Sequence, residues 1–330
     1  MTNLMRILIA YDDSDYARAA IDDLRRAGLP RDVHALVVSV ADVALPPPSP
    51  EMVVNSANVA SPRVTALLAK VQAQAAEGLK EAQSQALQGC ERVQSLFPAW
   101  RVEAATPAGT PAWEIIKKAH EWHAELIVVG SQGRSALGRL IMGSVSMKVA
   151  HEAPCSVRIG HAGFAIGDEL KIVPMRIVIG VDDSPDARAA VAAVAAREWQ
   201  PGSEARIVSV ANQPAPPAIA GLVPTAAGMI AETRQDDARQ KQDMLDEAAM
   251  ILREANLNVS AEMMTGDAQR VLIEEAVRTQ ADCIFVGSRG LRGIIERLRL
   301  GSVSSGVAAN ALCSIEIVRT RQSASSDFAY

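Results

Sequence analysis

Two glycine-rich turns in this 330-residue chain carry residue types that suit the binding of an anion. The first reads Gly-Ser-Gln-Gly at 130–133 and, after nine intervening residues, Gly-Ser-Val-Ser at 143–146. Glycine permits positive φ and lets a ligand reach the backbone, so successive N–H groups and the N-terminus of a following helix could surround phosphate oxygens. The hydroxyls of Ser144 and Ser146 could add donors. A sharp turn before a serine-capped helix, with no ligand, is the structural alternative.

A second copy of the turn strengthens the functional interpretation. Gly-Ser-Arg-Gly at 287–290 leads to Gly-Ser-Val-Ser at 301–304, and each turn directly follows a short apolar segment, 126–129 or 283–286. The intervening loop holds nine residues in the first copy and ten in the second. The sequence therefore predicts the first site more strongly than the second.

Arg134 and Arg289 lie beside these turns. They could neutralise phosphate charge, although we favour a solvated surface position for both. The chain contains neither the GxxxxGK[ST] pattern of a Walker lysine nor the GxSxG pattern of a nucleophile elbow. Any phosphate recognition would therefore depend on backbone amides and hydroxyls.

Two other pairs of equivalent residues stand at the ends of apolar segments: an aspartate pair after the first segment of each copy, and a valine pair after the second. Asp12 and Asp182 close the first segment of each copy, where a carboxylate could accept hydrogen bonds from ribose hydroxyls or cap the next helix. Val40 and Val210 close the second segments, where they could line an adenine or belong to the core. Both interpretations of each pair remain open at this point.

The whole chain repeats itself. Residues 6–21 match residues 176–191 at an offset of 170, and the later blocks match at an offset of 157 or 158. Both copies end alike, in APCSVRI at 153–159 and ALCSIEI at 311–317. The period is too long for a solenoid. We expect two complete domains of one fold, at 1–160 and 175–320, with a linker at 161–174 and a frayed tail at 321–330.

Short apolar segments alternate with amphipathic segments in each copy. Strands are expected at 4–10, 35–40, 101–105, 126–129 and 156–159, and helices after Ser14, over about 64–87, after Thr110 and from Ser144. Ser184 before Pro185 predicts a capped helix start in the second copy. Alternation with buried strands predicts an α/β fold with two tandem, doubly wound, parallel sheets, whose ligands lie beyond the carboxyl ends of the strands.

These elements and motifs together resemble the universal stress protein family, as a tandem pair that covers nearly the whole chain. The resemblance is carried by the strand, Asp-x-Ser, long loop, strand, Gly-x2-Gly-x9-Gly-Ser and final Ala-Pro-Cys-Ser-Val strand. It implies a Rossmann-like sandwich, similar to the adenine nucleotide alpha hydrolases, with five parallel strands per domain. Members of the family divide into those that bind ATP and those that do not, and the ATP binders carry the glycine pattern.

The resemblance also implies a role for each matching residue. Ribose would be held by Asp12 and adenine by Val40, with Asp182 and Val210 in the same roles in the second copy. The residues implied at the phosphates are Gly130, Ser131, Gly133, Gly143, Ser144 and Val145, and, in the second copy, Gly287, Ser288, Gly290, Gly301, Ser302 and Val303. From their place in the turns we add Arg134, Ser146 and Ser304 as candidate site residues. The cofactor would be ATP, with or without Mg²⁺.

Composition excludes several other classes of partner. Thirty-three Lys and Arg against 38 Asp and Glu give a net charge of −5, and aromatic residues make up only 3%, so nucleic acid is not an expected partner. No apolar stretch is long enough to span a bilayer. The four cysteines form no CxxC pair, which favours a reducing compartment, and we expect a cytoplasmic protein.

We expect a nucleotide-responsive regulator with an unidentified protein partner. One alternative is a slow ATPase that uses Asp12, Asp13 or their repeat counterparts Asp182 and Asp183. The other is a scaffold without nucleotide that uses the Pro-rich loops at 46–50 and 214–217. The resemblance also implies an edge-to-edge pairing of last strands, as is common when family members dimerise, and unpaired strand edges invite such association. We therefore expect the last strands, 156–159 and 314–318, to pair within one chain as a pseudo-dimer, with a further homodimer possible.

Overall fold

The computed structural model describes residues 4–42, 62–133, 142–161, 173–211, 224–289 and 300–320, with side chains described from residue 69 in the first long helix and from residue 239 in the second. The predicted Pro-rich loops, most of the predicted linker and the predicted frayed tail lie outside these residues. We refer to residues 4–161 as the first half and to residues 173–320 as the second half.

Strands and helices alternate in both halves. The first half consists of β1 (Met5–Ala10), α1 (Asp15–Asp23), the 3₁₀ turn η1 (Leu24–Arg26), β2 (Val33–Val38), α3 (Pro62–Leu96), β3 (Arg101–Ala105), α4 (Pro111–Glu121), β4 (Leu126–Gly130), α5 (Ser144–Glu152) and β5 (Ser156–Gly160). The second half consists of β6 (Arg176–Val181), α6 (Pro185–Ala195), β7 (Glu204–Ala211), α7 (Pro224–Glu254), β8 (Asn258–Thr265), α8 (Ala268–Arg278), β9 (Cys283–Gly287), α9 (Ser302–Asn310) and β10 (Ser314–Val318).

The predicted helix starts are confirmed. The Ser14 hydroxyl accepts a hydrogen bond from the Ala17 amide at the start of α1, and the Ser184 hydroxyl accepts one from the Ala187 amide at the start of α6. Thr110 is the N-cap of α4, with Pro111 in the first turn. Serine caps satisfy an amide that has no partner within the helix, so these short polar residues fix where each helix begins.

Two boundaries differ from the prediction. The second strand was expected at 35–40 but is β2, Val33–Val38, which leaves Val40 just beyond its end. The long helix was expected to end near Leu87 but continues to Leu96, because Val93 is fully buried and Leu96 packs against the same core. No proline interrupts the helix between Leu87 and Pro98.

The ten strands form one continuous sheet in the order β3-β2-β1-β4-β5-β10-β9-β6-β7-β8. All pairs within a half are parallel, which confirms the predicted doubly wound α/β fold. The central pair, β5 with β10, is antiparallel and aligns Glu316 with Arg158. The predicted pairing of the two last strands within one chain is thus present in the structure.

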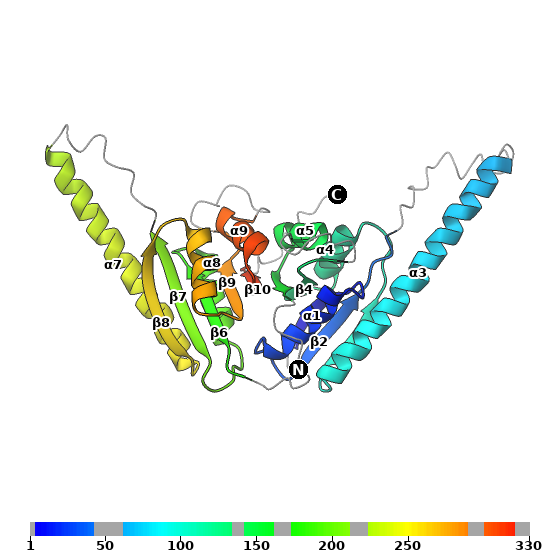
Figure 1. Cartoon of the computed structure of the whole chain (residues 1–330), viewed down its shortest axis with the longest axis horizontal. Helices are drawn as coiled ribbons and strands as arrows, with labels where there is room; N and C mark the ends of the chain where they lie inside the picture. Colours follow the sequence, from blue (N-terminus) through cyan, green and yellow to red (C-terminus); the bar gives the residue numbers. More distant parts are fainter. Residues whose placement is uncertain are drawn as a thin grey trace.

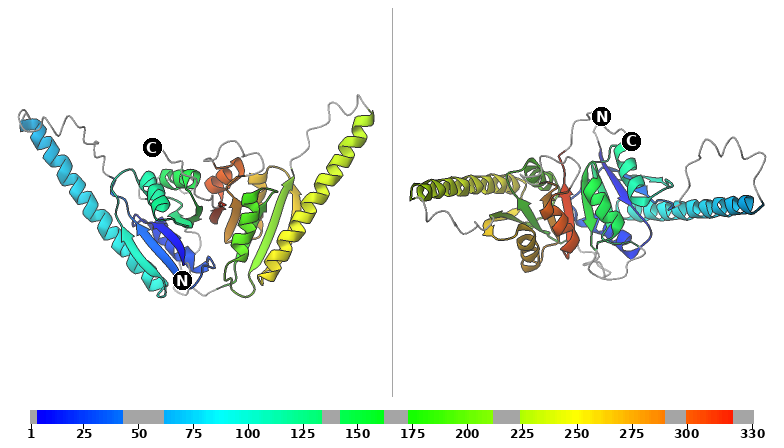
Figure 2. Two further views of the ribbon diagram at one scale, coloured as in Figure 1. Left: turned by 180° about the vertical axis from the view of Figure 1, so that it is seen from behind. Right: turned by 90° about the horizontal axis from the view of Figure 1, so that it is seen from above.

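The two halves lie side by side with β5 and β10 between them (Figures 1 and 2). The long helices α3 and α7 lie at the two outer flanks and extend past the body of their half (Figure 1). One core cluster runs across the junction and contains Val157, Ile159, Ile315 and Ile317 from the two central strands. The opposite face has a separate core in each half.

Burial of these aliphatic side chains stabilises the junction. Each fully buried Val or Ile contributes roughly 1.5–3 kcal/mol. The halves are therefore joined by apolar packing on one face of the sheet as well as by the strand pair. No helix among the described residues is long and apolar enough to cross a membrane.

Candidate functional site

A pocket of about 760 Å³ opens at the carboxyl ends of β6, β7 and β9. In the strand order of the second half, β6 lies between β9 and β7, so this is where the direction of winding reverses and where ligands of such sheets bind. The predicted site residues that line the pocket are Asp182, Val210, Gly287, Gly301, Ser302, Val303 and Ser304. The copy with the longer loop, expected to be the weaker site, therefore has its site residues gathered around a pocket.

Four amides of the two turns are already hydrogen-bonded within the protein. Ser131 N–H donates to Gly160 O and Gly143 N–H donates to Ser131 O, at 3.1 and 2.9 Å. The second half repeats both bonds, from Ser288 N–H to Val318 O and from Gly301 N–H to Ser288 O, both at 2.8 Å. These four amides close the loop and tie it to the last strand, so they do not point toward a ligand.

The helices that follow the turns begin without a side-chain cap. Gly143 precedes α5 and Gly301 precedes α9, and neither helix has a capping side-chain hydrogen bond. By contrast, α6 is capped by Ser184 and α8 by Asp267. The first amides of a helix have no acceptor within it, and they carry the positive end of the helix dipole. The start of α9, at Ser302–Ser304, therefore presents donors to the pocket.

Among the described turn glycines none has a positive φ, and Gly130 and Gly287 are needed for space. Positive φ occurs at other glycines of the described chain, Gly28, Gly109, Gly202 and Gly266. A Cβ on Gly130 would lie 2.8 Å from the Tyr16 carbonyl carbon, and one on Gly287 would lie 2.7 Å from the Asp186 carbonyl carbon. These two glycines let the strand end pack against the backbone of α1 or α6.

Two other glycines lie closer to the expected ligand position. A Cβ on Gly133 would lie 3.0 Å from Asp12 Oδ2, which places the end of β1 directly beside the first turn. A Cβ on Gly301 would meet Ser288 O at 3.4 Å. The structure thus brings the predicted ribose carboxylate and the predicted phosphate turn of the first half together.

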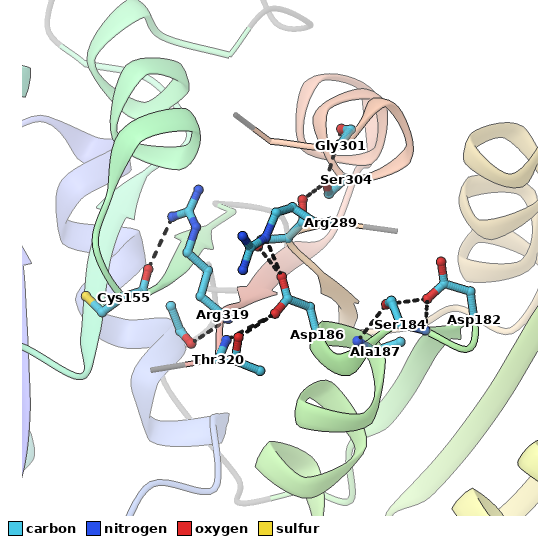
Figure 3. A network of polar contacts seen from close by, with 12 residues as sticks. Cys155, Asp182, Ser184, Asp186, Ala187, Arg289, Gly301, Ser304, Arg319 and Thr320 are labelled. Carbon is cyan, nitrogen blue, oxygen red and sulfur yellow. Dashed lines mark hydrogen bonds and ion pairs between the residues drawn. The ribbon is translucent and has the colours of Figure 1, made fainter. Parts of the chain in front are cut away.

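The carboxylates expected at ribose also take part in helix capping. Asp12 Oδ1 accepts from Ser14 N and Ser14 Oγ at 3.1 and 2.6 Å. Asp182 Oδ1 accepts from the same two groups of Ser184. In Figure 3 the second oxygen of Asp182 points away from the Ser184 cap. Capping, one of the two alternatives that the sequence left open, therefore uses only one oxygen of Asp182.

The hydroxyls of Ser146 and Ser304 are used inside the turns. Ser146 donates to Gly130 O at 2.6 Å, and Ser304 contacts Ser288 O at 3.0 Å. Both serines are buried, whereas Ser144 and Ser302 are exposed at the first position of their helices. The buried serines hold the helix against the turn, so of each pair only the first hydroxyl faces outward.

A buried carboxylate that the sequence analysis did not single out organises the second turn (Figure 3). Asp186 is 2% exposed and accepts from Ser288 Oγ at 2.6 Å, Arg289 Nε at 3.1 Å and Thr320 Oγ1 at 2.8 Å. Burial alone would raise the pKa of Asp186, but these hydrogen bonds outweigh it and lower the pKa. A single carboxylate therefore fixes both side chains of the turn.

Arg289 is held by that carboxylate and also lines the pocket. The solvated position that we favoured for Arg289 is therefore wrong: its side chain is 24% exposed and forms an ion pair with a buried acid. Arg134 and Gly290 lie outside the described residues. The signal that could have revealed Asp186 is its place two residues after the cap Ser184, in the first turn of α6.

The same network reaches into the first half through the end of the chain. Arg319, next to Thr320, donates to Ala150 O and His151 O at 2.6 and 3.1 Å and to Cys155 O at 3.2 Å. These carbonyls belong to the last turn of α5 and the residues after it, where a cation is favourable. Burial lowers the pKa of Arg319 to about 10. The second turn is thus connected to the helix that starts at the first turn.

The valines predicted to line adenine are half-buried. Val40 and Val210 both pack against the shared core cluster, as do Val145 and Val303. Val210 and Val303 in addition line the pocket. In the second half, core contact and pocket lining are combined in the same side chains.

Other candidate chemistry finds no support among the residues that the structure describes. No group of three or more His, Cys, Asp or Glu in these ranges could hold a metal ion. Burial raises the pKa of the Cys283 thiol well above its ordinary value and that of Cys313 to about 12. Both thiols are therefore protonated at neutral pH and behave as apolar core groups.

The fold and the position of the pocket define a Rossmann-like α/β protein with a pocket at the switch point of the sheet. Comparison with protein families places two matches to the universal stress protein family on the chain, at residues 3–159 and 175–319. The chain belongs to the universal stress protein family. This confirms the resemblance drawn from its motifs.

Individual relatives agree with this assignment. A universal stress protein of Mycobacterium tuberculosis is 28% identical over 210 residues, which is 64% of this chain and 66% of the relative. The match thus spans just under two thirds of that relative's length. A universal stress protein of Thermus aquaticus is 32% identical over 151 residues, 46% of this chain and 94% of the relative.

Solved structures share the fold across both halves. A universal stress protein from Archaeoglobus fulgidus covers 96% of this chain and 98% of its own, with a TM-score of 0.58 at 18% identity. A universal stress protein from Pseudomonas aeruginosa covers 96% of this chain and 93% of its own, with a TM-score of 0.53 at 13% identity. At such identities these similarities establish the fold alone.

Proposed function

We propose that this universal stress protein binds ATP in the pocket of the second half and acts as a nucleotide-responsive regulator. The observation that carries the proposal is the meeting, in one pocket, of the uncapped start of α9, the arginine of the turn and a strand-end carboxylate. Its volume of about 760 Å³ lies within the range of small-molecule sites, ~300–1,000 Å³.

Each part of the nucleotide has a candidate partner. Amides of Ser302 and Val303 at the start of α9 suit the phosphates, and the exposed Ser302 hydroxyl can add a donor. Oδ2 of Asp182 suits a ribose hydroxyl, and Val210 supplies an apolar wall for adenine.

The charges around the pocket are compatible with a polyanion. Asp183 is paired with Arg188, and Asp267 is used to cap α8. Lys241 lines the pocket, and so does Arg289, which is paired with the buried Asp186. Mg²⁺ would enter with the nucleotide, coordinated by phosphate oxygens, as Mg²⁺ commonly is. Bound ATP would change the surface that a protein partner contacts beside the pocket.

Slow ATP hydrolysis is an alternative that uses the same pocket. Hydrolysis needs a group that orients the attacking water, and Asp182 is the candidate. Phosphate release by wild type that disappears in the combined variant Asp12→Asn, Asp182→Asn would support the alternative. Release that survives the double substitution would reject it.

The internal bonds of the turn amides favour a second alternative, a scaffold without nucleotide. Because Ser288 and Gly301 donate within the protein, the turn is complete without a ligand. A cytoplasmic location stays a prediction under either function.

Thermal unfolding with and without millimolar MgATP tests the proposal. A ligand at about 100 times its dissociation constant adds roughly 2.7 kcal/mol of stability, which corresponds to several degrees. cAMP is a useful second probe because one solved universal stress protein is described as a complex with cAMP. An unchanged midpoint at saturating ATP contradicts the proposal.

Asp182→Asn gives the sharper test. The asparagine retains the oxygen that accepts from Ser184 but places an amide at the second oxygen, so the cap survives and a ribose acceptor is lost. We expect ATP affinity to fall about tenfold, a change of ~1.4 kcal/mol. Asp12→Asn is the matched control in the first half and should leave binding in the second-half pocket unchanged.

A further inference from the structure

The junction between the halves places two residues of opposite charge on its axis of approximate symmetry. The last strands correspond at an offset of 158, which makes Arg158 and Glu316 equivalent positions of the repeat. The antiparallel register aligns Arg158 with Glu316. Each of these residues therefore faces its own repeat equivalent, and this happens only at the position through which the symmetry axis passes.

Both side chains are buried and bonded to each other. Arg158 is 0% exposed and Glu316 is 1% exposed. Arg158 Nη1 and Glu316 Oε2 lie 3.1 Å apart. Asp23 accepts from Arg158 Nε at 2.6 Å, and Arg197 pairs with the other oxygen of Glu316. Four charges thus alternate in sign across the junction, two from each half.

The other ion pairs across the junction also occur only in one sense, whereas two backbone contacts are repeated: His161 N–H donates to Ser314 Oγ and Arg319 N–H donates to the equivalent Ser156 Oγ, both at 3.2 Å. Arg26 of the first half pairs with Asp282 of the second at 2.7 Å, but Ala196 stands at the repeat equivalent of Arg26. The equivalents of Asp23 and Arg197 are Ala193 and Ala27. A junction between two identical halves would form each ion pair twice, and this sequence cannot do that.

We infer that the buried charges of the central strand pair make unlike halves pair with each other. The surface around Arg158 accepts a strand that carries a carboxylate at the symmetry axis. The second half of the same chain supplies that strand. Two first halves would bring arginine against buried arginine, and two second halves would bring glutamate against buried glutamate. Like charges directly opposite in a sheet are destabilising, and buried charges without a partner are more so.

The inference bears on assembly of the whole chain. Both last strands are already paired with each other, so the sheet ends at β3 and β8. A further homodimer, which the sequence left open, cannot use the last strands without breaking the chain's own junction. The closed chain is the arrangement that satisfies the charges, with β5 ending at Gly160 and β6 beginning at Arg176.

Re-pairing of the halves in a cleaved chain tests the inference. A protease site placed within residues 162–172 allows the folded protein to be cut, dissociated in urea and renatured, and native mass spectrometry then counts each kind of pair. Random pairing would give mixed and like pairs in equal total amounts. We expect mixed pairs to exceed like pairs at least tenfold. Random proportions would overturn the inference.

A variant without charges at the symmetry axis is the matched control for the re-pairing experiment. Arg158→Met combined with Glu316→Leu removes both axis charges while roughly conserving volume. Asp23 then keeps its hydrogen bond from Ser314 Oγ, and Arg197 keeps its hydrogen bond to Ala27 O. The excess of mixed pairs should fall at least threefold in this variant. An excess equal to that of the wild type would show that the axis charges do not select the partner.

The intact chain gives a second measurement that does not depend on refolding of the halves. Glu316→Arg places two arginines on the axis and should lower the unfolding midpoint by on the order of 10 °C. Glu262→Arg, the same charge change at a half-exposed position of β8, is the control and should shift the midpoint far less. Equal shifts would contradict the inference. A wild-type chain that forms a dimer by exchanging halves would contradict the assignment of the partner to the same chain.

Discussion

The two glycine turns share one backbone arrangement and differ in what holds their side chains. In both, the serine amide bonds to the last strand and the helix-start amide bonds back to the serine carbonyl. In the second half, Asp186 binds Ser288 and Arg289. The first half has Tyr16 at the position of Asp186 and Gln132 at the position of Arg289.

The difference leaves a polar group without a partner in the first half. Ser131 Oγ is buried and has no hydrogen-bond partner among the described residues, whereas Ser288 Oγ is bonded to Asp186. Duplication thus preserved the backbone of the turn while the side chains around it diverged. The turn pattern predicts a backbone shape, and the residues packed against it decide what charge it presents.

The largest expected effect concerns what the turns share. Gly130→Ala and Gly287→Ala each place a Cβ within 3 Å of helix backbone, so each should destabilise the protein by about 3 kcal/mol. Chemical denaturation measures the loss. Gly78→Ala is the control, because its Cβ would meet nothing within 4 Å and alanine favours a helix, so a gain of ~0.5–1 kcal/mol is expected. Unequal losses of unfolding free energy from Gly130→Ala and Gly287→Ala would contradict the claim that the two turns share one backbone arrangement.

The next effect separates the halves. Asp186→Asn removes the charge that holds Arg289 and weakens the bonds to Ser288 and Thr320, so the free energy of unfolding should fall by about 2 kcal/mol. Tyr16→Phe at the equivalent position should change it by less than ~0.5 kcal/mol. Similar losses from both substitutions would show that Asp186 has no special role.

The serines give a smaller and more direct test. Ser288→Ala leaves a buried carboxylate with one fewer donor and should cost about 1.5 kcal/mol. Ser131→Ala removes a hydroxyl that lacks a partner among the described residues and should be close to neutral. Urea denaturation of the two variants compares them, and a reversed order would contradict the assigned contacts.

Lowering the pH should reduce the difference in the free energy of unfolding between the wild type and Asp186→Asn. The folded-state pKa of Asp186 lies below its ordinary value of 3.8, so its charge stabilises the folded state above that pH and the contribution is lost as pH falls further. Unfolding free energies of the two proteins, measured from pH 6 to pH 3, should converge at the acid end. A constant gap would show that the carboxylate charge is not involved.

Much of the fold could be predicted because its determinants are local. The caps at Ser14 and Ser184 and the strand bounds at 101–105 follow from short patterns. The pairing of the last strands was expected from the family resemblance together with the repeat. The end of α3 was missed because burial of Val93 is a tertiary contact. Local sequence patterns predict strands and helices, but they do not show how far along a helix the contact with the core continues.

The sequence predicted where the candidate site lies in the fold, but it did not predict which side chains contact one another there. Asp182 and the start of α9 do meet at one pocket, as the spacing indicated. Asp186 reaches its turn across 102 residues, and Gly287 is a glycine because α6 backbone lies against it. Such contacts depend on how elements pack, and a single sequence does not give their distances.

A crystal structure grown with a non-hydrolysable ATP analogue tests the central claim most directly. We expect the triphosphate at the amides of Ser302 and Val303, the ribose at Asp182 and the adenine against Val210. A second-half pocket that stays empty at saturating analogue, or an analogue bound elsewhere on the chain, would contradict the proposal that this pocket is the nucleotide site.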